Sequence, residues 1–183
     1  YENRVEASYI ENINVYAAKT LNEVVEHLKG NALLPVVEMQ KYSADEEDVF
    51  YSVDMSLVKG QAAAKRALEI AVSGGHNIIF VGPPGSGKTM LAKCIPSIMP
   101  NMDFEEALET TKIHSVAGRL NPEDGIIKSR PFMTPHHTAT NVSLVGGSQA
   151  VKPGIISLAH NGVLFLDEMP EYPRITLEAL RQP

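Results

Sequence analysis

The pattern of apolar and polar positions predicts strands and helices in alternation along most of the chain. Residues 76–81, His-Asn-Ile-Ile-Phe-Val, have the length and composition of a buried parallel strand. Residues 162–168 lead an apolar run into two carboxylates, as in a strand whose carboxyl end faces a ligand crevice. The stretch from Ile113 to Val116 is a further candidate strand. Together these runs favour the α/β class.

Helical periodicity and terminal signals predict the intervening helices. Residues 62–73 carry a buried side made of Ala64, Ala67, Leu68 and Ala71. Asp103 and Glu106 form a plausible capping box for a helix running through about Thr111. Pro96 should end the helix before it, and Pro173 can open a last short helix.

The sequence pattern of residues 1–40 predicts a small structural unit that is separate from the rest of the chain. Residues 13–17 suggest a strand, and Thr20 with Glu23 is a capping-box signal for a helix that Gly30 would end. One strand and one helix offer too little surface for a core, so we interpret 1–40 as an α+β remnant, the tail of a preceding domain. An acidic linker, 41–54, would separate it from a domain at 55–183.

A glycine-rich loop follows the strand predicted at 76–81. It reads Gly82-Pro83-Pro84-Gly85-Ser86-Gly87-Lys88-Thr89 and fits the P-loop pattern G-x-x-x-x-G-K-[ST]. Met90 then begins a helix, so backbone N–H groups and the helix dipole would favour an anion in the loop. Lys88 would reach the β- and γ-phosphates, and Thr89 would hold Mg²⁺. A glycine-rich turn that binds nothing is the alternative, which the strand, loop and helix context disfavours.

Two carboxylates at the end of the second apolar run supply the rest of the expected site. Asp167 would hold Mg²⁺ directly or through water, and Glu168 would polarise the attacking water. An apolar run that ends in Asp-Glu is often only a strand leaving the core. Its pairing with the P-loop favours the catalytic interpretation.

Composition narrows the classes of protein further. The 183 residues carry a formal net charge of −6, which argues against a uniformly basic coat for nucleic acid. Cys94 is the only cysteine and is expected to be a small buried thiol, which fits a reducing cytoplasm. No apolar run reaches about 18 residues, so no membrane span is expected. The start at Tyr1 and the stop inside a helical pattern suggest a fragment of a longer protein.

The segment 117–161 differs from the rest in composition, because it is rich in Gly, Pro, Thr and His. From Lys112 to Lys152 the chain has five basic and two acidic residues, a formal charge of +3. A connection this long is usually functional or disordered. His136 and His137 suggest metal only weakly, because no further cysteine or carboxylate stands at ligand spacing.

Long ordered matches show a resemblance to a known family. The matching runs are VKGQAAAKRALEIAVSGGHNIIFVGPPGSGKTMLA, RPFMTPHHT, LVGG, PGIISLAHNGVLFLDEMPE and LEALRQP. In these runs the chain resembles the magnesium-chelatase-like AAA+ ATPases, and closely the ComM (YifB) subgroup. Within the first run, Val58, Gln61 and Met90 are further candidate nucleotide contacts. Residues 1–40 look like the end of the Lon-protease-like domain that precedes the ATPase in this family.

The resemblance implies a fold, cofactors and partners. The fold would be a P-loop αβα sandwich with a mostly parallel sheet, truncated before the sensors, arginine finger and lid. ATP or ADP and Mg²⁺ would bind between subunits of a ring, often a hexamer. Because the finger and lid would be missing, the isolated chain should be a weak ATPase.

Three functions stay open on these residues. The first is an ATPase motor acting on DNA, as ComM-type proteins are implicated in branch migration. The second is the ATPase subunit of a chelatase complex with a protein partner, and the third is an assembly module without significant turnover. For the first, Lys128, Arg130 and Lys152 are candidate phosphate contacts, since they lie in the basic segment between the two motifs.

Overall fold

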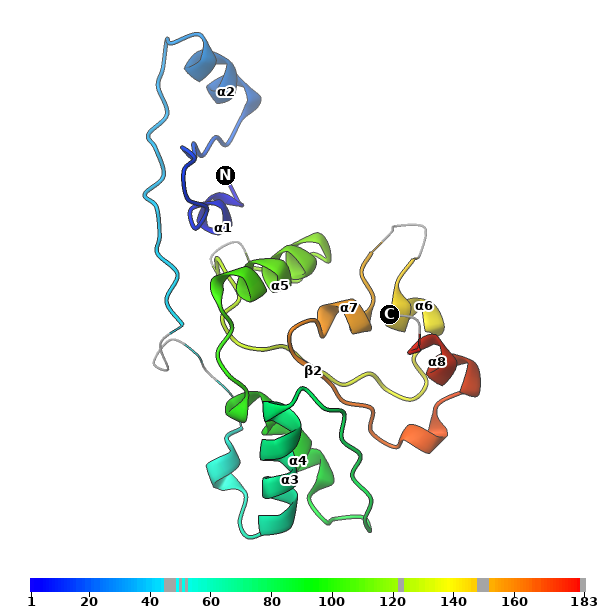
Figure 1. Ribbon diagram of the computed structural model, residues 1–183. Coiled ribbons are helices and arrows are strands. Elements are labelled where there is room, and N and C mark those ends of the chain that lie inside the picture. Colours follow the sequence, from blue (N-terminus) through cyan, green and yellow to red (C-terminus); the bar gives the residue numbers. More distant parts are fainter. Residues whose placement is uncertain (45–48, 50, 52, 122–123, 148–151, 182–183) are drawn as a thin grey trace.

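The computed structural model describes residues 1–44, 49, 51, 53–121, 124–147 and 152–181. Helices are the commonest regular structure in these ranges, and short strands bring distant segments together (Figure 1). The elements in chain order are α1 (Arg4–Ala7), α2 (Leu21–Leu28), η2 (Met55–Leu57), α3 (Ala62–Ser73), α4 (Lys88–Lys93), η3 (Ile95–Ile98), α5 (Phe104–Val116), β1 (Phe132–Met133), α6 (Asn141–Val145), α7 (Ile155–Leu158), β2 (Val163–Leu164), η4 (Met169–Glu171) and α8 (Arg174–Ala179).

The described strands β1 and β2 form one parallel pair. Phe132 lies opposite Val163, and the backbone N–H of Val163 donates to the carbonyl of Pro131 at 2.8 Å. Gly162 permits this approach, because a Cβ there would lie 2.1 Å from that same carbonyl oxygen. The strand predicted within 162–168 therefore forms, but only Val163 and Leu164 are paired in a ladder.

The strand predicted at 76–81 does not form, which corrects the sequence-based expectation. Among the described residues no segment donates to or accepts from the backbone of 77–81, and only β1 and β2 are strands. Val81 is 91% exposed and Ile79 is 74% exposed, whereas Phe80 packs against the core. An apolar run becomes a strand only where a neighbour completes its hydrogen bonds, and the described part of the chain offers none.

The main hydrophobic core lies between α3, α4 and the strand pair. Leu68 of α3 and Leu91 of α4 are buried, and Phe132 and Phe165 pack against their cluster from the strands. α3 has the predicted bounds, and it buries Leu68 and Ala71 as expected. Ala67 is exposed instead, so the buried stripe is narrower than predicted.

The helix α5 is longer than predicted. It begins at the predicted capping box, where Asp103 and Glu106 bond reciprocally, and it continues to Val116. The strand expected at 113–116 is therefore wrong. His114 explains the continuation, because its helical position brings the ring Nε2 to 2.9 Å from the carbonyl oxygen of Leu158 at the end of α7.

The N-terminal segment forms only sparse structure. Thr20 caps α2 by accepting from the N–H of Glu23, and Gly30 has φ +76° after the helix, as predicted. The strand expected at 13–17 is reduced to one antiparallel bridge between Tyr16 and Val36. An extended stretch then leads away from α2 (Figure 1). The acidic run 45–48 lies outside the described residues.

A second, smaller core holds α5. Met102, Ala107 and Ile126 are buried, and Tyr9 and Tyr42 pack against them from the N-terminal region. The Tyr42 hydroxyl also donates to the carbonyl of Met102 at 2.6 Å. Segment 1–40 thus touches the rest of the chain through Tyr9, and its boundary as a separate domain stays a prediction.

Candidate functional site

The glycine loop forms a shallow depression before α4. Gly85 and Gly87 have φ of +75° and +86°, in the left-handed region that glycine enters without a steric penalty. A cavity of about 260 Å³ is lined by the six residues from Gly85 to Met90. Within the described part of the chain, no hydrogen bond occupies the backbone N–H groups of Gly87, Lys88 or Thr89. Free N–H groups of this kind suit an anion.

Lys88 folds back over its own loop. Its Nζ donates to the carbonyl oxygens of Gly82 at 2.8 Å and Pro83 at 2.9 Å. The ammonium group is therefore held beside the loop that carries the free N–H groups. An anionic oxygen would make a stronger, charge-assisted partner than either neutral carbonyl.

A hydrogen bond joins the two motifs. The Thr89 hydroxyl donates to Asp167 Oδ2 at 3.1 Å, although the two residues are 78 positions apart. This contact follows from the fold, because β2 ends just before Asp167 while the core packs α4 against the strands. A hydroxyl and a carboxylate oxygen are ligands that Mg²⁺ accepts, usually together with waters and phosphate oxygens. The donor set therefore fits the predicted magnesium site.

Glu168 lies exposed at the same edge in an uncommon backbone conformation. Its φ is +51°, and its N–H donates to Asp167 Oδ1 at 3.0 Å. Its side chain faces His137, whose Nδ1 lies 3.7 Å from Glu168 Oε2. Non-glycine residues in this region of φ cluster at functional sites. From the sequence, His137 was considered only as a weak candidate metal ligand. Its contact with Glu168 was missed because no strand was predicted before it.

The further candidates Val58 and Gln61 lie beside the loop in different environments. Val58 is buried in the main core, and its carbonyl accepts from Lys65 Nζ at 2.6 Å. Gln61 Nε2 donates to the carbonyl of Ser86 at 3.2 Å, which ties the start of α3 to the glycine loop. Gln61 thus contacts the candidate site directly, whereas Val58 belongs to the core that supports it.

Arg130 does not lie on the surface, which corrects its assignment as a DNA contact. Only 8% of it is exposed, and it forms an ion pair with Glu106 at 2.9 Å. Its other donors reach the carbonyls of Pro100, Asn101 and Asn161. A guanidinium committed to these partners has no donor left for a phosphate. Lys128 is half-buried and Lys152 is exposed.

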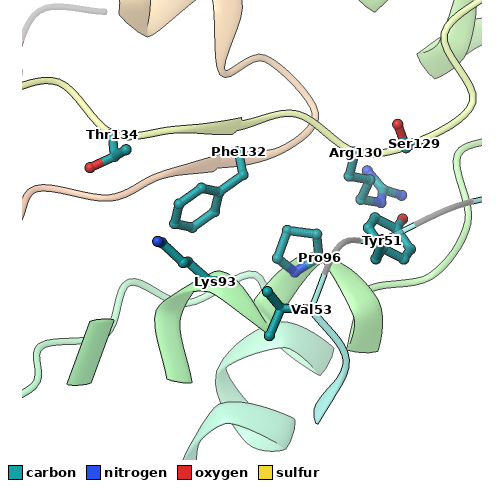
Figure 2. Close-up of a pocket in the computed structure, with 8 residues that line it drawn as sticks. All are labelled: Tyr51, Val53, Lys93, Pro96, Ser129, Arg130, Phe132 and Thr134. Carbon is teal, nitrogen blue, oxygen red and sulfur yellow. The ribbon is translucent and has the colours of Figure 1, made fainter. Parts of the chain in front are cut away.

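A second cavity, of about 340 Å³, is lined by residues that do not belong to the glycine loop (Figure 2). Lys93 enters it from α4, and Phe132 and Arg130 enter it from the β1 segment. Because the guanidinium of Arg130 is fully paired, the cavity has fewer available donors than its lining suggests. Among the described residues, no group of three or more His, Cys, Asp or Glu side chains could hold a metal ion.

Comparisons with known proteins assign the chain to a family. The family described as "Magnesium chelatase, subunit ChlI" matches residues 54–183. Competence protein ComM of Haemophilus influenzae is 48% identical over all of this chain, which covers 36% of that relative. YifB of Escherichia coli is 52% identical over 71% of the chain and 26% of the relative, and YifB of Salmonella typhimurium is 42% identical over the whole chain and 35% of the relative. The chain thus spans about a third of the length of such relatives.

These matches support an AAA+ module of the ATPase type, and the mixed helices and strands with a small parallel sheet are compatible with an α/β P-loop fold. Within that class the chain belongs to the magnesium-chelatase-like family, in its ComM and YifB branch. Membership implies nucleotide and Mg²⁺ binding in general, and members usually oligomerise. None of the helices in the described ranges has the length and apolarity needed to cross a bilayer.

Proposed function

We propose that the chain is the nucleotide-binding part of an AAA+ motor that couples ATP hydrolysis to remodelling of DNA. The observation that carries the nucleotide part is the 3.1 Å hydrogen bond between Thr89 and Asp167. It supports this part of the proposal, because a single ion could contact both the hydroxyl and the carboxylate that the two motifs assign to Mg²⁺. The proposed architecture is an αβα sandwich at 55–183, preceded by a linker at 41–54 and a remnant of another domain at 1–40.

Each residue of the site has one proposed task. Lys88 would exchange its two carbonyl partners for phosphate oxygens, which attract its charge more strongly. Thr89 and Asp167 would hold Mg²⁺, which neutralises charge on the phosphates when bound. Glu168 would orient and polarise the attacking water. Because this chemistry depends on positioning and charge, an assembled ring, proposed as a hexamer, would be the active form.

The DNA part of the proposal rests on similarity to the competence protein ComM and on the basic segment. Because Arg130 is buried and paired with Glu106, only Lys128 and Lys152 of the three candidates remain as proposed phosphate contacts. The chelatase-type alternative, in which a protein partner replaces DNA, is favoured by the description of the matching family. An assembly module with no significant turnover is the third interpretation of the same site.

ATP hydrolysis by the full-length protein, measured with and without branched DNA, tests the proposal. Branched DNA should raise the steady-state rate several-fold, and Glu168→Gln should reduce that rate by about a hundredfold while ATP still binds. A duplex without a branch is the control substrate. A rate that branched DNA leaves unchanged would favour the chelatase-type alternative. Parental turnover by Glu168→Gln would contradict the role of Glu168.

A further inference from the structure

His137 and Glu168 meet although they belong to segments that are far apart in the sequence. β1 and β2 are parallel, so the residues that follow them emerge at the same edge of the sheet. His137 lies four residues after the end of β1, and Glu168 lies four residues after the end of β2. Their side chains converge there, with His137 Nδ1 3.7 Å from Glu168 Oε2.

The turn that carries His137 is held by specific contacts. The buried Tyr172 hydroxyl donates to the carbonyl of Pro135 at 2.5 Å, which fixes the start of the turn to the segment before α8. The ring of His136 lies against that of His137, with centroids 4.1 Å apart. His136 Nδ1 is itself occupied by the hydroxyl and N–H of Thr138. Of the two histidines, only His137 is therefore directed at the carboxylate.

We propose that His137 is a positioning residue for Glu168. This inference rests on the proposed function, in which Glu168 orients the attacking water. Glu168 is exposed and would otherwise sample many rotamers, so His137 with a proton on Nδ1 would restrict its carboxylate to the edge beside Asp167. A contact of 3.7 Å is longer than a hydrogen bond, and such contacts in catalytic sites often tighten once the ligand is bound.

Replacement of His137 in the full-length protein gives the kinetic test. His137→Ala should lower kcat for ATP hydrolysis about tenfold and leave KM within about twofold, because the water is misplaced while the phosphate contacts persist. His137→Asn, whose amide can donate from nearly the same place as Nδ1, should restore most of the rate. In a Glu168→Gln background, His137→Ala should cause no further loss.

The matched control is His160, which pairs with Glu109 at 3.1 Å on the surface, away from the site. His160→Ala should leave kcat at the parental value. A parental kcat in His137→Ala would overturn the positioning role, as would an additive loss in the double variant. If the parent itself hydrolyses no ATP, the proposed function fails instead.

An NMR measurement tests the contact between His137 and Glu168 independently of ATP turnover. With ¹⁵N-labelled histidine, the chain's 6 histidines can be assigned by substitution, and the Nδ1 resonance of His137 followed. Glu168→Gln should shift that resonance, because the charged partner of Nδ1 is removed, and should leave His160 unmoved. An unmoved His137 resonance would overturn the proposal whatever the ATPase rate shows.

Discussion

At the scale of single residues, the site depends on a few polar atoms placed by the backbone around them. Gly85 and Gly87 adopt positive φ, which lets the loop turn with its N–H groups free for an anion. Lys88 meanwhile donates from Nζ to the carbonyls of Gly82 and Pro83. Asp167 reaches Thr89, and Glu168 reaches His137, from consecutive positions. The two carboxylates therefore point to different partners, which is what separate roles in metal binding and water activation require.

Cys94 gives a prediction at this scale that concerns stability. It is fully buried in the main core, and burial, with the nearby charge of Asp54, raises the pKa of its thiol. The folded state therefore keeps the proton to a higher pH than the unfolded chain. The raised pKa therefore contributes to the free energy of unfolding below pH 9.0, the ordinary pKa of the thiol. This stabilisation is lost as the pH rises above that value.

Urea unfolding between about pH 7 and about pH 10 checks the sign. Relative to Cys94→Ala, the parental chain should lose stability more steeply above about pH 9. Tyr42 and Tyr172 are common to both chains and cancel in the comparison. Parallel stability curves for the two chains would show that the thiol ionises equally in both states.

At the scale of elements, local signals in the sequence located helices better than strands. The capping box of Asp103 and Glu106 and the glycines after residue 73 are short-range features, so α5 begins and α3 ends where predicted. A strand depends on a distant partner, so part of the run 162–168 forms β2 against β1, whereas 76–81 stays unpaired among the described residues. The end of α5 was predicted wrongly because His114 contacts α7, and no local sequence pattern predicts such a tertiary contact.

In the candidate site, too, the contiguous motifs could be predicted from the sequence, whereas the contacts between distant segments could not. The loop 82–89 and the pair Asp167 and Glu168 could be named from the sequence, because each forms a contiguous motif. Their meeting through Thr89, and the contact of His137 with Glu168, depend on the parallel pairing of β1 and β2. The charge of Arg130 was visible in the sequence, but its burial was not, since its partners come from distant segments.

Arg130 also carries a prediction about how the elements are held together. It links α5 to the segments that precede β1 and β2, through Glu106 and the carbonyl of Asn161. Arg130→Met should lower the free energy of unfolding by about 3 kcal/mol, since it leaves buried acceptors unpaired. The matched control is Arg66→Met, which removes an exposed pair with Glu69 at 2.8 Å and should cost less than about 1 kcal/mol. Equal losses in urea unfolding would contradict the structural role.

At the scale of the whole molecule, charge is distributed unevenly. The chain is acidic overall, yet the segment between the two motifs has a formal charge of +3 from Lys112 to Lys152. Because Arg130 is buried, the basic surface proposed to bind DNA consists of Lys128 and Lys152. Such a surface would bind phosphates in a salt-dependent manner, with little regard to base sequence.

Joint replacement of Lys128 and Lys152 by serine in the full-length protein tests that surface. DNA affinity should fall, and the slope of log affinity against log salt should flatten by up to about 2, because each lysine would neutralise one phosphate. Lys29→Ser with Lys41→Ser, outside the segment, is the control of equal charge. An unchanged slope in the first variant would remove the segment from the DNA-binding surface and favour a protein partner.

The central claim is that the glycine loop, Thr89 and Asp167 bind a magnesium nucleotide, and calorimetric titration with ATP tests it most directly. The parental protein should bind ATP more tightly with Mg²⁺ than with EDTA. Lys88→Ala should weaken binding at least about tenfold, because a neutral side chain cannot replace its charge-assisted contacts. Asp167→Asn should remove most of the Mg²⁺ dependence. Equal ATP affinity in the parent and in Lys88→Ala, with circular dichroism showing both folded, would contradict the account.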